Sequence, residues 1–538
     1  MIRQLAIASM AISFVIVNAR VWTGDPRRPW ADAIAIEGDR IAAVGSSAEI
    51  RKLAGTARVI DAKGAMVVPG FIDSHVHFVE GGARLSSVQL RDARTPEEFT
   101  ARVKAFAATV PAGTWILGGD WDHQNWGGAL PTRAWIDSVT PQHPVFVTRL
   151  DGHMSVGNSL AMRAAGISRA TADVPGGEIV RDAAGEPTGL LKDNATDAVW
   201  RVIPPRGEAL DDRALDAAMA YVAAQGVTGV HNMGTWEELA TFARAARAGR
   251  LRTRIYAAVP LDSWERLGAY VKERGFGDQW LRWGGLKSFV DGSLGSHTAA
   301  FLEPFTDAPA DRGLFVTSNE ERYAAIKGAD ALGLQLMVHA IGDRAIREQL
   351  DVFARVAKEN GPRDRRFRIE HAQHIAPADL PRFAALGVIA SMQPYHAIDD
   401  GRWAEKVIGP ERAKGTYAFK SLLDAGARVA FGSDWFVAPP TPLEGIYAAV
   451  TRRTLDDANP GGWVPEQRIT VDQALRAYTT GAAYAGFAEG DRGVLRSGML
   501  ADIVIIDRDL TRVPPETIRD AKILLTMVGG TVVFEAKP

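Results

Sequence analysis

The 538-residue sequence contains no cysteine. This absence excludes disulfide bonds, a cysteine nucleophile and thiolate ligands, so any metal must be held by nitrogen and oxygen donors. The remaining composition, with 46% hydrophobic and 23% charged residues, is ordinary for a folded globular protein of enzyme size.

Long apolar runs and blocks of like charge are also missing. Beyond the N-terminal segment, the sequence contains no stretch of about 18 uninterrupted apolar residues, which is the length that a membrane-spanning helix needs. The formal net charge is only -2, and without a basic or acidic block nothing favours a nucleic acid or an anionic membrane as partner. We therefore expect a small-molecule partner, no nucleic acid and no membrane.

The N-terminal segment MIRQLAIASMAISFVIV is apolar after a single arginine, which suggests a secretory signal. It runs directly into NARVWTGD, however, which is typical of a strand and a turn, so cleavage there would remove part of the fold. We predict a short extension, a first strand near Ile12 to Val17 and a cytoplasmic protein, with secretion as the alternative.

The segment VVPGFIDSHVHF, residues 67–78, places His75 and His77 two positions apart at the end of an apolar run. Alternate residues of a strand share one face, so both imidazoles project to the same side and form a potential pair of metal ligands. A single His-x-His pair is weak evidence for a metal, and the rest of the chain must supply further ligands.

Four more polar residues lie at or near the ends of predicted strands. His339 closes LGLQLMVHA, His371 closes RFRIEHAQ, Asp434 closes RVAFGSD, and Lys287 occupies the corresponding place in LRWGGLKSFVDGS. The C-terminal ends of the strands are where a barrel of alternating strands and helices collects its catalytic groups. Structural histidines scattered at random would not be expected to fall at these positions.

The predicted fold class is α/β, a distorted (β/α)8 TIM barrel with accessory parts. Eight candidate strands supply the number that a closed barrel requires: 71–77, 227–233, 254–259, 283–290, 334–339, 367–371, 388–392 and 429–434. Period-two strand patterns at both ends predict one small β-sandwich domain. The predicted parts are 1–66 and 490–538 (sandwich), 67–79 (first barrel strand), 80–225 (insertion) and 226–489 (rest of the barrel).

The 80–225 stretch is far longer than an ordinary connection between a strand and a helix, so we interpret it as an inserted α/β domain that covers the catalytic face. Its segment PVFVTRLDGHMSVGNS brings Arg149, Asp151 and His153 to a turn, where they could contact substrate. Four tryptophans of the insertion could do the same, although each taken singly fits the core of the insertion better: Trp115, Trp121, Trp126 and Trp135.

Several segments together resemble the amidohydrolase superfamily, within it the amidohydrolase-3 group of YtcJ-like proteins and N-substituted formamide deformylases. They span nearly the whole chain and are longer than a bare ligand pattern: PGFIDSHVHF, GGDWDHQNW with PTRAWID, DGHMSVGNSLA, GEPTGLLKDNA, GLKSFVDGSLGSHTA, VHAIGDRAI, RIEHAQ and GSDW followed by PPTPLEGI.

This resemblance implies a set of metal ligands, namely His75, His77, Lys287, His339, His371 and Asp434. It implies two divalent cations, zinc first, with manganese, iron or cobalt as alternatives. A lysine that has lost its proton can capture carbon dioxide, and the resulting carboxylated Lys287 would bridge the pair. Asp434 would act as general base and then acid while a metal-activated hydroxide attacks the carbonyl.

Other polar residues are weaker candidates. His153 and Lys287 join Asp434 in the predicted catalytic set, and predicted substrate contacts are His153, Trp121, Asp291 and Arg149. Asp291, Asp343 and Arg344 could orient the imidazoles from behind. His374 competes with His371 as a ligand, but should lie beyond the strand end. We interpret five further histidines as structural or rim residues: His123, His143, His231, His297 and His396.

Three functional hypotheses follow. The first is a metal-dependent amidohydrolase that cleaves a C–N bond in an amide, N-acyl or N-formyl compound. The second is another reaction with one metal, such as deamination or hydrolysis of a cyclic amide or ester; a shared lysine ligand would be unnecessary there. The third, a non-catalytic binding protein, is disfavoured because all six ligand positions are filled. A homodimer is the default expectation for the oligomeric state.

Overall fold

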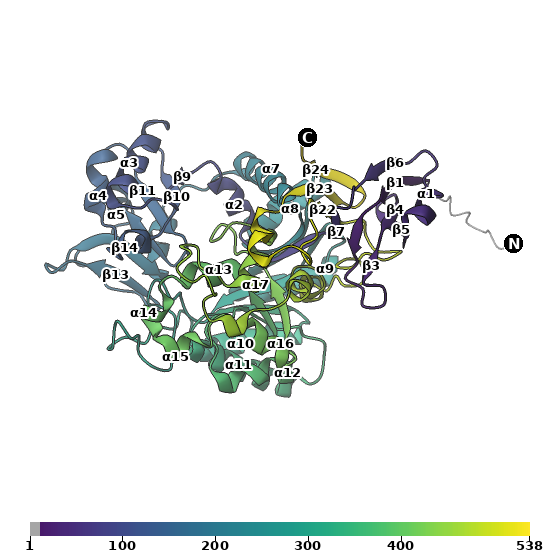
Figure 1. The fold of residues 1–538 in the computed structure, drawn as a ribbon. Coiled ribbons are helices and arrows are strands. Elements are labelled where there is room, and N and C mark those ends of the chain that lie inside the picture. The colour runs from purple at the N-terminus through teal and green to yellow at the C-terminus, as the bar shows by residue number, and fades with distance from the viewer. Residues whose placement is uncertain (1–10, 538) are drawn as a thin grey trace.

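The computed structural model describes residues 11–537, and its centre is a barrel of eight parallel strands (Figure 1). The strands follow the predicted order and nearly the predicted bounds. They are β8 (Phe71–Val76), β15 (Val227–Met233), β16 (Arg254–Pro260), β17 (Leu281–Phe289), β18 (Gln335–Ala340), β19 (Arg368–His371), β20 (Ile389–Met392) and β21 (Arg428–Phe431).

The barrel closes between its first strand and the segment that follows its last strand. The backbone N–H of Asp434 donates to the carbonyl of His75 at 2.7 Å, and the N–H of His77 donates to the carbonyl of Trp435 at 2.6 Å. Gly432 permits this approach, because a Cβ there would lie 2.6 Å from the nitrogen of His75. Closure therefore brings His75, His77 and Asp434 to the same end of the barrel.

Helices cover the outside of the barrel (Figure 1). In α11 the apolar residues Ile346, Leu350 and Phe353 recur every three or four positions and are buried against the sheet. The helices that follow successive strands are α8 (Trp236–Arg247), α9 (Trp264–Arg274), α10 (Asn319–Ala331), α11 (Asp343–Asn360), α12 (Leu380–Leu386), α13 (Pro394–Asp400), α14 (Ala404–Ile408), α15 (Pro410–Ala413), α16 (Phe419–Asp424), α17 (Pro442–Thr451), α18 (Val471–Arg476) and α19 (Ala482–Ala485).

Strands from both ends of the chain share one sheet, as the sequence predicts. Its order is β24-β23-β22-β7-β2-β3, and β7 from the N-terminal part pairs antiparallel with β22 from the C-terminal part. A second sheet, β5-β4-β1-β6, lies beside it, with α1 (Ser47–Arg51) (Figure 1). The strand bounds are β1 (Ile12–Val17), β2 (Arg20–Trp22), β3 (Trp30–Ala31), β4 (Ala33–Glu37), β5 (Arg40–Gly45), β6 (Arg58–Asp61), β7 (Met66–Pro69), β22 (Ile503–Ile506), β23 (Ile523–Val528) and β24 (Thr531–Glu535).

The insertion after β8 carries a third accessory sheet, in the order β13-β14-β12-β11-β10-β9. Its strands are β9 (Val88–Gln89), β10 (Ile116–Trp121), β11 (Val145–Arg149), β12 (Met154–Gly157), β13 (Gly177–Arg181) and β14 (Pro187–Asp193). Its helices are α3 (Pro96–Ala107), α4 (Arg133–Ile136), α5 (Ser159–Ala164) and α6 (Asp197–Trp200).

Two helices at the edges of the predicted insertion pack against the barrel rather than within the inserted domain. Helix α7 (Glu208–Ala224), which the sequence analysis assigned to the insertion, packs against α2 (Phe78–Arg84) and against β15 of the barrel. Its apolar residues Leu215, Met219 and Val222 belong to the core of the barrel. Both α2 and α7 therefore lie outside the inserted sheet.

The predicted N-terminal extension and the alternative of a secretory signal rest chiefly on residues 1–10, which lie outside the described residues. The predicted first strand is confirmed, because β1 runs from Ile12 to Val17. In the described part of the chain, helices of membrane-spanning length and apolarity are absent.

Candidate metal centre

The six predicted ligands come from five barrel strands and meet at one end of the barrel. His75 lies in β8 with His77 just beyond it, Lys287 lies in β17, His339 in β18, and His371 ends β19. Asp434 follows β21. Five of the six side chains belong to residues that are at most 7% exposed; His77 is the more accessible one.

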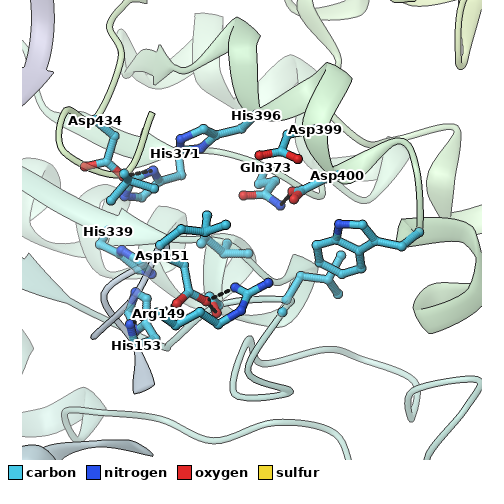
Figure 2. Close-up of a pocket in the computed structure, with 17 residues that line it drawn as sticks. Arg149, Asp151, His153, His339, His371, Gln373, His396, Asp399, Asp400 and Asp434 are labelled. Carbon is cyan, nitrogen blue, oxygen red and sulfur yellow. Dashed lines mark hydrogen bonds and ion pairs between the residues drawn. The ribbon is translucent and has the colours of Figure 1, made fainter. Parts of the chain in front are cut away.

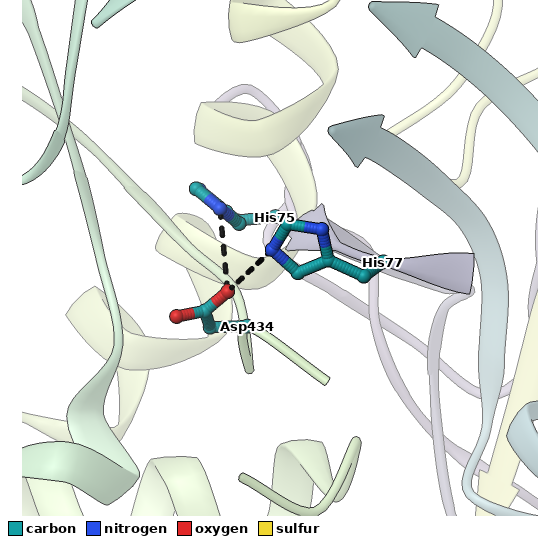
Figure 3. Close-up of side chains that lie close together, drawn as sticks. All are labelled: His75, His77 and Asp434. Carbon is teal, nitrogen blue, oxygen red and sulfur yellow. Dashed lines mark ion pairs between the residues drawn. The ribbon is translucent and has the colours of Figure 1, made fainter. Parts of the chain in front are cut away.

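Three of these side chains form a tight group (Figure 3). Oδ1 of Asp434 lies 3.3 Å from Nε2 of His75 and 3.3 Å from Nε2 of His77. Although buried, this oxygen accepts no hydrogen bond of acceptable geometry from the described residues. A buried carboxylate oxygen is rarely left in this state, so the group requires a partner from outside the chain.

Glu370 explains why a cation fits here. Its Oε2 lies 2.6 Å from Nδ1 of His75, which fixes the ring proton on Nδ1 and leaves a lone pair on Nε2. That lone pair lies 3.3 Å from Oδ1 of Asp434 and 3.2 Å from Nζ of Lys287. A buried carboxylate beside a nitrogen lone pair is stabilised by positive charge at this place, which a bound cation would supply.

His371 lies next to the group of His75, His77 and Asp434, and His339 lies next to His371. The ring centroid of His371 lies 4.9 Å from that of His75 and 4.5 Å from that of His339. Nδ1 of His371 pairs with Oε1 of Gln393 at 2.8 Å, and Nε2 of His339 donates to the carbonyl of Gly292 at 3.0 Å. In both rings the opposite nitrogen keeps a lone pair available for a metal.

Lys287 reaches the same centre from β17. Its Nζ lies 3.2 Å from Nε2 of His75, and the side chain is buried. Burial lowers the pKa of Lys287 to about 8, so a substantial fraction of the amine is neutral just above pH 7. A neutral amine is the form that can react with carbon dioxide.

Burial also sets the charges of the remaining ligands. It lowers the pKa of His75 to about 4 and holds the pKa of His339 and of His371 well below the usual range. Burial raises the pKa of Asp434, but the surrounding imidazoles, His75 first, outweigh this effect when they carry a proton, so the pKa of Asp434 stays well below the usual range. Neutral imidazoles beside an ionised carboxylate are the donor set that a divalent cation requires.

The backbone is strained at two of these residues. His371 has φ of 71° and Asp434 has φ of 62°, both in the left-handed region that residues other than glycine rarely adopt. Such conformations cost on the order of 1–3 kcal/mol each and persist only where the surrounding structure enforces them. Their position at two candidate ligands is typical of a functional site.

A polar network inside the barrel supports the ligands, and sequence reasoning missed it. The buried guanidinium of Arg368 donates to both carboxylate oxygens of Glu370 at 2.7 and 3.1 Å, to the carbonyl of Ser74 at 2.6 Å and to Ser391 at 2.9 Å. Nδ1 of His231 lies 2.9 Å from the same group. The period-two placement of Arg368 and Glu370 in RFRIEH is the one signal that could have revealed it.

A cavity opens beside the candidate ligands (Figure 2). His339, His371 and Asp434 line one end, and residues from the insertion and from α13 line the remainder. Its interior volume is about 50 Å³. Because one water-sized probe needs roughly 10–15 Å³, there is room for only a few waters or a small chemical group.

Two predicted substrate contacts from the insertion line this cavity. Nδ1 of His153 pairs with Oδ1 of Asp193 at 2.6 Å, so Nε2 is the nitrogen available to a substrate. The guanidinium of Arg149 is held by Asp122 at 2.9 Å and by Asp151 at 2.7 Å. Arg149 therefore lines the cavity as an ion-paired group.

Two other predicted contacts lie elsewhere. Trp121 is completely buried in the core of the insertion, and its indole nitrogen donates to the carbonyl of Val147, which supports the core interpretation of this residue. Asp291 is completely buried behind His339 and accepts hydrogen bonds from the backbone of Ala300, Ile341 and Gly342. Neither side chain lines the cavity, so these two predictions are corrected.

The structure also shows the surroundings of the weaker candidate residues. His374 packs beyond the strand end, as expected, with Nδ1 2.8 Å from the hydroxyl of Thr416. The carboxylate of Asp343 accepts from the backbone of Leu302, and Arg344 pairs with Glu348 on the surface of α11, so neither orients an imidazole. His396, interpreted as a structural or rim residue, lines the cavity, with a ring nitrogen within 4.8 Å of ligand atoms of His371 and Asp434.

Comparison with known proteins places this geometry in a family. Residues 58–534 match the model of the amidohydrolase family. The chain is 40% identical to the protein LONG AFTER FAR-RED 3 of Arabidopsis thaliana over 98% of this chain and 92% of that protein. It is 31% identical to the putative amidohydrolase YtcJ of Bacillus subtilis, over 94% of this chain and 96% of that protein.

Two further matches agree with the predicted group and fold. The chain is 30% identical to N-substituted formamide deformylase of Arthrobacter pascens over 97% of this chain and 98% of that protein. A solved metal-dependent hydrolase of unknown function from Pyrococcus horikoshii superposes with a TM-score of 0.76 and 28% identity, over 93% of this chain and 99% of that chain. The chain therefore belongs to the amidohydrolase family and is a metal-dependent hydrolase with a (β/α)8 barrel.

Proposed function

We propose that this enzyme hydrolyses the C–N bond of a small amide, N-acyl or N-formyl compound. The observation that carries the proposal is the buried Oδ1 of Asp434, which lies between Nε2 atoms of His75 and His77 without a hydrogen bond. A similar N-substituted formamide deformylase supports the choice of bond.

The residues that would hold the metal are the six predicted ligands, and the donor chemistry fits. His75, His77 and Asp434 would bind one cation and His339 and His371 a second, with Lys287 carboxylated between them. When bound, such cations acidify a water molecule and polarise a carbonyl oxygen. Zinc suits the nitrogen and oxygen donors, as do manganese, iron and cobalt.

Asp434 is the proposed general base and acid. Its carboxylate faces the cavity and is ionised at neutral pH, so it can take a proton from the attacking water. Returning that proton to the departing nitrogen is essential, because an unprotonated amide nitrogen is a very poor leaving group. His153, held by Asp193 on the other side of the cavity, is the proposed substrate contact from the insertion.

The size of the cavity favours a small acyl group. A volume of about 50 Å³ beside the ligands accommodates a formyl or acetyl group more readily than a large acyl chain. The remainder of the substrate would extend past Leu150 and Trp403, which line this cavity and the larger adjoining one. A cytoplasmic location and a homodimer stay predictions.

Metal analysis of the purified enzyme, together with a panel of amides, N-formyl and N-acetyl amines, cyclic amides and esters, tests this proposal. We expect two metals per chain and hydrolysis of N-acyl substrates, and we expect Lys287→Ala to lose one metal and nearly all activity. Lys272→Ala, at an exposed position of α9, is the matched control. One metal per chain with an indifferent Lys287→Ala variant would favour the one-metal alternatives.

A further inference from the structure

His396 has a buried ring nitrogen that the proposed chemistry leaves without a role. Within residues 11–537, two buried side-chain atoms without a hydrogen-bond partner belong to residues that line the cavity, Oδ1 of Asp434 and Nε2 of His396. The metal site explains the first. The second belongs to a histidine in the first turn of α13, directly after β20 (Figure 2).

The surroundings of His396 argue against a structural role. Only its backbone N–H forms a hydrogen bond, to the carbonyl of Gln393 at 3.2 Å, and the imidazole forms none with the described residues. An imidazole carries at least one N–H in either protonation state, so the ring can donate a hydrogen bond. Leaving a buried polar atom unpaired costs on the order of 1–3 kcal/mol.

The position of His396 defines what could pair with it. One of its nitrogens lies within 4.8 Å of a ligand atom of His371 and of Asp434. A group bound between them would therefore contact His396 as well. In the proposed reaction the group at this place is the carbonyl of the scissile amide.

We propose that His396 is a further catalytic residue, whose Nε2–H donates a hydrogen bond to the carbonyl oxygen of the substrate. This inference rests on the proposed amide hydrolysis. As the water oxygen bonds to the acyl carbon, its proton passes to Asp434 and the π electron pair of the carbonyl moves onto the oxygen. When that pair returns, the C–N bond breaks and the nitrogen takes the proton from Asp434. A donor fixed near the carbonyl oxygen stabilises the charge at its largest.

A ligand role for His396 is the competing interpretation, because its nitrogen also forms a potential metal group with His371 and Asp434. The predicted ligands already supply about three protein donors for each of two cations. Catalytic sites commonly hold a metal through three protein ligands and keep a position open for water or substrate. A further imidazole on the metal would fill that open position, which favours contact with the substrate.

Variants of His396 in the metal-loaded enzyme separate these roles. The probe is the N-formyl or N-acetyl arylamine that the wild-type enzyme hydrolyses fastest. We expect His396→Ala to lower kcat by about 10²–10³-fold, with unchanged metal content and a thermal midpoint equal to or above that of the wild type. His396→Gln, which restores an N–H donor, should recover part of kcat.

His297→Ala is the matched control, since this histidine lies outside the cavity and pairs with Asp307 at the surface. Loss of metal in His396→Ala would overturn the inference in favour of a ligand role. A kcat within about threefold of the wild type would overturn it as well. A wild-type enzyme that cleaves no amide would overturn the proposed function together with this inference. Equal amide hydrolysis by the wild type and by His396→Ala would overturn the inference alone.

Discussion

Three of the candidate ligands, all histidines, owe their available lone pair to a partner on the opposite ring nitrogen. Glu370 holds His75, Gln393 holds His371 and the carbonyl of Gly292 holds His339. Such partners fix the tautomer and orientation of an imidazole before a metal arrives. At the scale of single residues, the affinity for metal should therefore depend on side chains that never touch it.

Replacing Gln393 by methionine tests this dependence, because methionine has a similar volume but offers His371 no comparable acceptor. We expect Gln393→Met to weaken metal affinity by about 10–100-fold, measured by titration of the metal-free protein with zinc. Gln142→Met changes the same residue type at an exposed position and should bind zinc as the wild type does. Equal affinities of the two variants would contradict the proposed orientation of His371.

At the scale of elements, the contacts that close the barrel also bring the candidate ligands together. The hydrogen bonds that join β8 to the segment after β21 are formed by the backbone of the candidate ligands: Asp434 N–H donates to the carbonyl of His75, and His77 N–H donates to the carbonyl of Trp435. Asp73 reinforces this junction by accepting from the hydroxyl of Ser433 at 2.5 Å and from its backbone at 2.9 Å. Any change that separates these two segments should damage stability and metal binding together.

Gly432→Ala is such a change. A Cβ at this position would lie 2.6 Å from the nitrogen of His75 and 2.7 Å from Oδ1 of Asp73, so the two segments must move apart. We expect the variant to lose about 1–3 kcal/mol or more in the free energy of unfolding, measured with urea, and to bind zinc more weakly.

Gly490→Ala is the control for this substitution, because a Cβ at Gly490 meets no atom within 4 Å. It should unfold at nearly the same urea concentration as the wild type. Wild-type stability and zinc affinity in Gly432→Ala would show that closure and site geometry are independent.

At the scale of the whole molecule, neutral histidines are buried in separate parts of the chain. Burial lowers the pKa of His123, in the insertion, to about 4 and that of His374, beside the barrel, to about 3. In the unfolded chain both have pKa values near 6.5. Between these values the unfolded state binds more protons, so stability falls as the pH decreases from about 6.5 towards 3.

His374→Gln should make this pH dependence shallower. The glutamine can still pair with Thr416 but takes up no proton on unfolding. We expect the wild-type protein, stripped of metal, to lose on the order of a few kcal/mol more than the variant between pH 7 and pH 4. Urea unfolding at several pH values measures the difference, and parallel curves would contradict a neutral His374 in the folded state.

The sequence predicted the barrel and a set of candidate ligands, because four of the eight apolar runs end in His or Asp and a fifth carries Lys287. It could not show which polar residues face inward. Trp121 and Asp291, predicted as substrate contacts, are buried by tertiary contacts, and His396, interpreted as a structural or rim residue, lines the cavity. The network of Arg368 and Glu370 was not predicted, because the sequence of their strand resembles that of an ordinary buried strand.

The most direct test of the account is a crystal structure of the purified protein with anomalous scattering measured at the zinc, manganese, iron and cobalt edges. We expect an anomalous peak among His75, His77 and Asp434, a second beside His339 and His371, and additional density for a carboxylate on Lys287. An active enzyme without an anomalous peak at these side chains would contradict the claim that they hold the catalytic metal.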